Sequence, residues 1–114
     1  MKQYTNESQT AKLIELGFEK PWRNEYLHIL EEYGYAVEEA RNFSIGELIE
    51  MLPEAICASH DDSCHYHLSM DTDACMWRVR YIDDFDVTLC ATYDVDLINA
   101  LYDVCVKLKE EGVI

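Results

Sequence analysis

The stretch DVDLINALYDVCVKLKEEG, residues 94–112, decides which fold this chain can adopt. Its apolar residues recur at steps of three and four, so they share one stripe of a helix: Leu97, Leu101, Val104, Cys105 and Leu108. Asp94 is a residue type that caps helix N-termini, and Gly112 is the type that follows a helix end. The pattern predicts an amphipathic helix over about residues 95–111. Its stripe either binds a partner or, as is usual in a small domain, closes the domain's own core.

Before this helix, from Cys64 onward, apolar and polar residues alternate as they do in strands. The alternating runs are residues 64–70 (CHYHLSM), 76–81 (MWRVRY) and 87–92 (VTLCAT). The connections MDTDA and DDFD are short and rich in aspartate, which indicates turns between antiparallel strands. We therefore predict an α+β fold: a three-stranded antiparallel β-meander, about residues 64–92, packed against the C-terminal helix.

The alternation also predicts which side chains face the helix. In the last strand it places Val87, Leu89 and Ala91 inward and Cys90 outward. The apolar faces of the three predicted strands lie on the same side of the sheet if the turn between the first two strands has an even number of loop residues and the turn between the last two an odd number.

Two or three short helices are expected before the meander. Asn6 with Gln9, and Ser44 with Glu47, have the spacing of capping boxes, and Gly17 is suited to end the first helix. The spacing of apolar residues also favours a helix over residues 24–33, whereas residues 57–63 (CASHDDS) are expected to form a loop.

Composition restricts the class of protein. With 114 residues, of which 49% are hydrophobic, the chain is predicted to form a single domain, residues 1–114. No apolar run approaches the roughly 20 residues of a membrane span, and no signal peptide is recognisable, so we expect a cytoplasmic protein. The five cysteines, an odd number, are interpreted as buried or free thiols.

The net charge of −14 argues against direct binding to nucleic acids and to anionic membranes, because like charges repel. The charge permits a basic protein partner or imitation of the charge of DNA, and solubility alone is the simpler explanation.

Three blocks of the sequence carry a resemblance: LIELGFEKP (residues 13–21), SIGELIEMLP (44–53) and LINALYDVCVKLKEEGVI (97–114). Together they resemble a group of small uncharacterised proteins encoded in phages and mobile elements of gut bacteria. The resemblance transfers no catalytic residue and no cofactor. It favours a non-enzymatic accessory protein that acts by binding another protein. A metal-binding or catalytic module and a DNA-mimic inhibitor are the alternatives.

The polar face of the meander is a candidate binding patch. The expected pairing places His67, Arg78 and Cys90 in one row of the sheet and His65, Arg80 and Thr88 in the next. Two arginines and two histidines in an acidic chain suggest a surface that accepts an anion or a protein partner. Alternatively, these side chains are solvated cross-strand neighbours or are covered by the N-terminal helices. An uncovered edge strand would also permit a homodimer.

The segment CASHDDSCHYH, residues 57–67, has side chains that bind transition metals. The candidates are His60, Cys64, His65 and His67, although their spacing matches no zinc finger or ribbon. Surface histidines and buried thiols are the alternative interpretation. Pairing a cysteine of this segment with a histidine as nucleophile and base is permitted but unspecific, and no glycine-rich phosphate loop is present.

Overall fold

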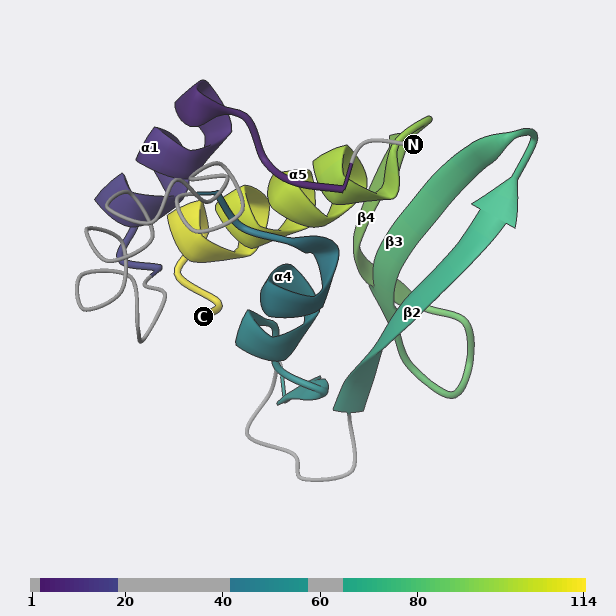
Figure 1. Cartoon of the computed structure of the whole chain (residues 1–114). Helices are drawn as coiled ribbons and strands as arrows, with labels where there is room; N and C mark the ends of the chain where they lie inside the picture. Colours follow the sequence, from purple (N-terminus) through teal and green to yellow (C-terminus); the bar gives the residue numbers. More distant parts are fainter. Residues whose placement is uncertain (1–2, 19–41, 58–64) are drawn as a thin grey trace, which may run out of the picture.

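In the computed structural model, the described residues are 3–18, 42–57 and 65–114. They form the helices α1 (Glu7–Glu15), α4 (Ile45–Met51) and α5 (Leu97–Glu110) and the strands β1 (Ala55–Cys57), β2 (His65–Asp73), β3 (Met76–Ile82) and β4 (Thr88–Asp94). Figure 1 shows α5 lying against the sheet, with α1 and α4 packed beside α5. None of the described helices is long and apolar enough to cross a membrane.

The strands form an antiparallel sheet in the order β1-β2-β3-β4. The predicted α+β class and the meander against the C-terminal helix are confirmed, but the sheet has one strand more than we predicted. The additional strand, β1, ends at Cys57, where we expected a loop to begin. With three residues, β1 is too short to show a two-residue period in the sequence.

The helix α5 confirms the prediction made from residues 94–112. Its stripe is buried throughout: Leu97, Ile98, Ala100, Leu101, Val104, Cys105 and Leu108. The helix ends as expected, because Gly112 has a φ of 72° and the Val113 N–H donates to the Leu108 carbonyl oxygen over 2.9 Å. The N-cap is Asp96 rather than Asp94. The Asp94 carboxylate instead accepts hydrogen bonds from the Asp96 N–H (2.9 Å) and the Asn99 side-chain amide (3.3 Å).

The inward face of β3 packs against α5, as β4 does. Val79 and Tyr81, two residues apart on β3, are both fully buried. The Tyr81 hydroxyl donates to the Pro53 carbonyl oxygen over 2.7 Å, which satisfies a polar group that would be costly to bury unpaired. This bond also fixes the segment between α4 and β1 against the sheet.

The inward residues of β4 differ from our prediction because of a β-bulge. Ile82 pairs with Thr88, which leaves an odd loop as expected, but Tyr81 pairs with Cys90. The bulge inserts one extra residue into β4, and a shift of one residue exchanges the two faces of a strand. Cys90 is therefore 2% exposed and faces the core, whereas Val87 is exposed.

The N-terminal capping boxes are confirmed at Asn6 with Gln9 in α1 and at Ser44 with Glu47 in α4. Gly17 has a φ of 97° and ends α1, and the Phe18 N–H donates to the Leu13 carbonyl oxygen. The helix predicted over residues 24–33 lies outside the described residues.

A chain of hydrogen bonds, buried except at Asn42, joins α1 to the segment before α4. The Phe43 N–H donates to the Thr5 hydroxyl (3.0 Å), the Thr5 hydroxyl bonds the Thr10 hydroxyl (2.7 Å), and Thr10 bonds the Asn42 side-chain oxygen (2.7 Å). A polar group is stable in a core when it is fully bonded in this way.

Candidate functional site

The two histidines and two arginines of the predicted binding patch, His65, His67, Arg78 and Arg80, lie on the sheet face that points away from α5. The register differs from the expected rows, because His67 pairs with Ile82 and not with Arg78. Arg78 pairs with Asp71 on one side and Tyr93 on the other, and Arg80 pairs with Ser69 and Ala91. Cys90, which we expected in this patch, faces the core.

The arginines of this face are engaged by carboxylates of β2. Arg78 makes a two-pronged contact with Asp71, in which Nε donates to Oδ1 over 2.7 Å and a second nitrogen bonds Oδ2. Asp73 lies 3.9 Å from Arg78, and Arg80 lies 3.7 Å from Asp71. The hydrogen bond from Arg78 lowers the pKa of Asp71 below its usual value. Any anion bound here would compete with these carboxylates, and the patch remains a prediction.

The metal candidates are only partly placed. His60 and Cys64 lie outside the described residues, while His65 and His67 are exposed on the outer face of β2. The register brings Cys57 opposite His65. Within the described ranges no group of three His, Cys, Asp or Glu side chains could hold a metal ion. The metal-binding hypothesis therefore stays a prediction from the sequence.

The placed cysteines fall into two classes. Cys90 and Cys105 are buried, whereas Cys57 and Cys75 are exposed. Burial raises the pKa of the Cys105 thiol to about 12, so this thiol is not ionised at neutral pH and is a poor nucleophile. Cys105 therefore serves the core, as the sequence indicated.

A feature that the sequence analysis missed is the loop between β3 and β4, residues 83–87, which displays an aromatic side chain. Phe85 is 87% exposed, and Val87, in the same loop, is 52% exposed. Burying a phenylalanine side chain contributes about 1.5–3 kcal/mol, and this loop does not use that energy within the described chain. The signal in the sequence was a phenylalanine between aspartates, which we interpreted only as a turn.

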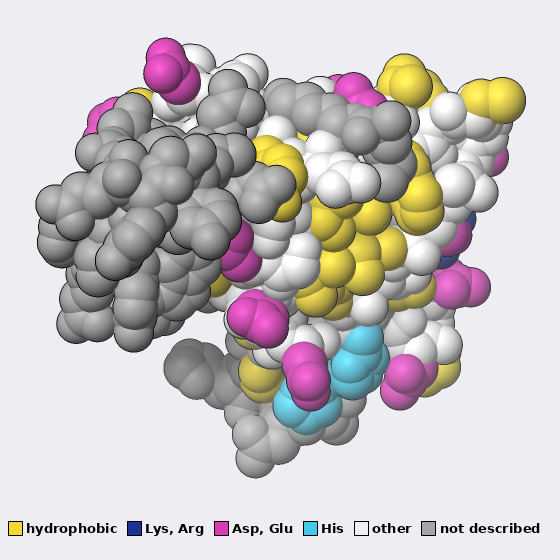
Figure 2. Space-filling model, in the orientation of Figure 1, with side chains coloured by type: hydrophobic (Ala, Val, Ile, Leu, Met, Phe, Trp, Pro, Cys, Tyr) yellow, Lys and Arg dark blue, Asp and Glu magenta, His cyan; other side chains and the backbone are white. Residues whose placement is uncertain are grey.

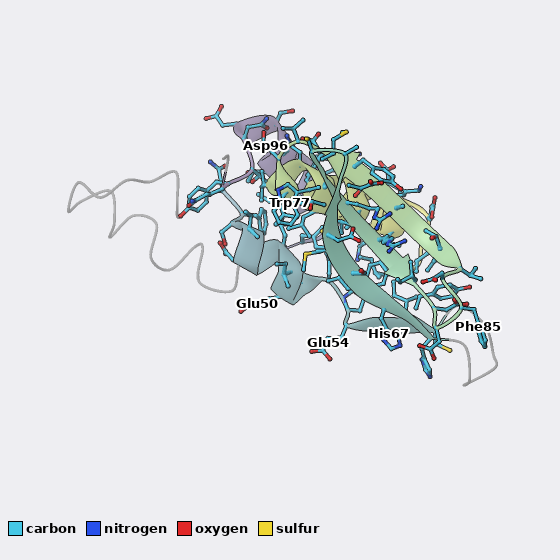
Figure 3. The ribbon with its side chains drawn as sticks, turned by 90° about the vertical axis from the view of Figure 1, so that its right-hand side faces the viewer. Glu50, Glu54, His67, Trp77, Phe85 and Asp96 are labelled. Atoms are coloured by element: carbon cyan, nitrogen blue, oxygen red, sulfur yellow. The ribbon has the colours of Figure 1, made fainter. Side chains whose placement is uncertain are left out.

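The loop has a defined conformation. The Asp83 carboxylate accepts from the N–H groups of Phe85 (2.9 Å) and Val87 (2.8 Å), and the Asp83 N–H donates to the Val87 carbonyl oxygen (3.0 Å). Asp84 and Asp86 are exposed on either side of Phe85. The result is an exposed aromatic side chain on a hydrogen-bonded loop, flanked by two carboxylates, at the end of the sheet shown in Figure 3.

A second feature is a groove between α4 and β2, with a volume of about 470 Å³. It is lined by Ile49, Leu52 and Leu68 and carries two carboxylates, Glu50 and Glu54. Figure 2 shows hydrophobic side chains gathered on this face of the molecule, above the two histidines at the start of β2.

The described carboxylates are spread over several elements, and many have structural roles. Asp71 bonds Arg78, Asp83 holds the β3–β4 loop, Asp94 bonds the start of α5, and Glu110 contacts Lys12 at 3.2 Å. Figure 2 likewise shows acidic side chains distributed over the visible face. The DNA-mimic hypothesis requires them along one elongated face, and the described residues do not favour it.

Comparison with known proteins gives no match to a family model, to a curated protein sequence or to a solved structure.

Proposed function

We propose that this chain is a non-enzymatic accessory protein of phage or mobile-element origin that acts in the cytoplasm by binding another protein. The observation that supports the proposal is Phe85, an aromatic side chain that is 87% exposed on a hydrogen-bonded loop. Aromatic residues are enriched among the side chains that dominate binding energy at protein interfaces. A loop that is already ordered also loses little conformational entropy when it binds.

The chemistry of the loop favours one kind of partner surface. Phe85 would enter an apolar pocket, and Val87 would widen the apolar contact. The carboxylates of Asp84 and Asp86 would meet Lys or Arg side chains around that pocket, and the net charge of −14 would speed the encounter with a basic surface.

The test is affinity capture from cells of the organism that encodes the chain. Wild type is expected to retain a specific protein that Phe85→Ala loses, with an affinity reduced at least tenfold, as is typical of a central aromatic contact. Val95→Ala is the matched control, because Val95 is an exposed apolar residue outside the loop. Phe85→Ala should change the free energy of unfolding by less than about 0.5 kcal/mol. Equal capture by Phe85→Ala, or no specific capture by wild type, would contradict the proposal.

A further inference from the structure

The strand β2 is longer than its neighbour on one side. β1 pairs with its first three residues only, through Ala55 with His67, Ile56 with Tyr66 and Cys57 with His65. Among the described residues, no strand lies beside residues 69–73 on that side, although β3 pairs with them on the other. Within the described part of the chain, residues 69–73 of β2 therefore form an open sheet edge.

At two residues of this edge, the backbone N–H and C=O groups point away from β3. The Leu68 N–H donates to the Glu54 carbonyl oxygen over 3.2 Å, so Leu68 bonds toward the β1 side. Because backbone groups along a strand alternate in direction, Met70 and Thr72 point their N–H and C=O groups to the same side. An added strand could therefore form a ladder with Met70 and Thr72 without breaking any bond between β2 and β3.

The side chains beside the edge differ on the two faces of the sheet. On the inner face, Leu68 lines the groove and Met70, two residues on, is 37% exposed. On the outer face, Asp71 and Asp73 are the residues next to the open edge. Glu50 and Glu54 lie at the groove, and Figure 3 shows them on the side of β2 where α4 lies.

We propose that the open edge of β2, residues 69–73, together with the α4 groove, binds an extended segment of a partner protein in which apolar residues alternate with Lys or Arg. The apolar side chains would pack against Leu68 and Met70. The basic side chains would lie on the outer face across from Asp73, whose side chain is 62% exposed, since the Asp71 carboxylate is already bonded to Arg78. A second copy of this chain is disfavoured, because it would bring another acidic edge and another charge of −14.

The proposal is tested with a blocked nine-residue peptide that alternates Lys and Val, using fluorescence anisotropy at low ionic strength. In an extended peptide, all valine N–H groups point to one edge and all lysine N–H groups to the other. N-methylation of one of these two sets should weaken binding at least tenfold, and N-methylation of the other set should change it less than about twofold. Equal effects of the two sets, or no binding at about 1 mM peptide, would overturn the proposal.

Protein variants locate the site. Thr72→Pro removes an N–H that faces the open edge, so it should weaken peptide binding at least tenfold. The variant is expected to fold, because proline is tolerated at such an edge position. Asp73→Asn should weaken binding several-fold, because it removes the exposed carboxylate that a basic side chain of the peptide would meet. Glu7→Gln, which removes one negative charge from α1, should not. If Thr72→Pro fails to fold, binding of the N-methylated peptides to the wild-type chain tests the proposal.

The oligomeric state separates a partner from a second copy. Light scattering should report a monomer at the concentrations used for peptide binding. A dimer that Thr72→Pro converts to monomer would assign the edge to a second copy and overturn the proposal. The edge is separate from the Phe85 loop and is tested with other variants, so either proposal can fail without the other.

Discussion

At the scale of single residues, the turn between β2 and β3 uses side chains that its geometry disfavours. Ala74 and Cys75 occupy the two turn positions with φ values of 51° and 67°. A two-residue hairpin turn with both φ values positive favours Asn and Gly, because a Cβ atom is crowded in the left-handed region. The long pairing of β2 with β3 holds the turn in this conformation.

We therefore expect Cys75→Gly to raise the free energy of unfolding by about 1 kcal/mol, since Gly adopts this φ without strain. Urea denaturation measures the change. Cys75→Ala is the control, because it removes the thiol but keeps the Cβ atom. An equal gain from Cys75→Ala would show that the thiol, and not the backbone conformation, was responsible.

Thiol reactivity provides a second prediction at this scale. Cys57 and Cys75 are exposed and should react with iodoacetamide in the native state, whereas Cys90 and Cys105 should react only after unfolding. Burial raises the pKa of both buried thiols, which leaves little of the reactive thiolate. Mass spectrometry of peptides from the labelled protein checks this. Labelling of Cys105 as fast as Cys75 would mean that α5 does not cover the core as described.

At the scale of elements, the two ends of α5 show which signals in the sequence are local. Gly112, with a φ of 72°, ends the helix at the expected place. The N-terminal end begins two residues later than Asp94 suggested, because Asp94 lies at the end of β4 and its side chain bonds the Asp96 N–H. A strand thus uses a residue that would otherwise have started the helix.

Two glycines provide a matched test of helix termination. Gly112→Ala should lower the free energy of unfolding by about 1 kcal/mol, because Ala is strained at a positive φ. Gly46→Ala should raise it by up to about 1 kcal/mol, since Gly46 lies in the exposed part of α4 and an added Cβ would meet only the Ser44 Oγ at 4.0 Å. Thermal or urea unfolding measures both. Changes of the same sign would contradict the assigned helix ends.

At the scale of the whole molecule, the balance of charge on the outer face of the sheet makes stability depend on pH. Arg78 holds the pKa of Asp71 below its ordinary value in the folded chain. The stabilisation by this pair is therefore present above the ordinary carboxyl pKa of about 4 and is lost as the pH falls through the folded value.

We expect Asp71→Asn to be less stable than wild type at pH 7, with the difference shrinking as the pH falls below about 4. Comparing the two proteins at each pH cancels the change in overall repulsion as the other carboxylates are protonated. Asp103→Asn is the control, and its effect on stability at pH 7 should have the opposite sign. Burial raises the pKa of Asp103, so the ionised carboxylate is disfavoured in the fold and its removal should stabilise the protein. Urea unfolding between pH 3 and 7 gives the values. A difference between wild type and Asp71→Asn that is constant across this range would contradict the assigned ion pair.

The sequence by itself determined the features that depend on neighbouring residues. The capping boxes at Asn6 and Ser44 and the end of α5 at Gly112 depend on residues a few positions apart, and the stripe of α5 and the alternation of β2 and β3 follow the repeat of a helix or a strand. Such features have a fixed spacing, so a pattern in the sequence specifies them.

The tertiary structure alone decided how these elements meet. The short strand β1, the bulge that turns Cys90 inward, the contact of Asp71 with Arg78 and the open edge of β2 beside the α4 groove depend on residues from different elements. The rows of the predicted patch belong to this second group: His67 pairs with Ile82 rather than with Arg78, and Cys90 faces the core. Pairing register can shift by one residue with little change in local pattern, and packing of the whole core selects one register because it must bury one face of each strand.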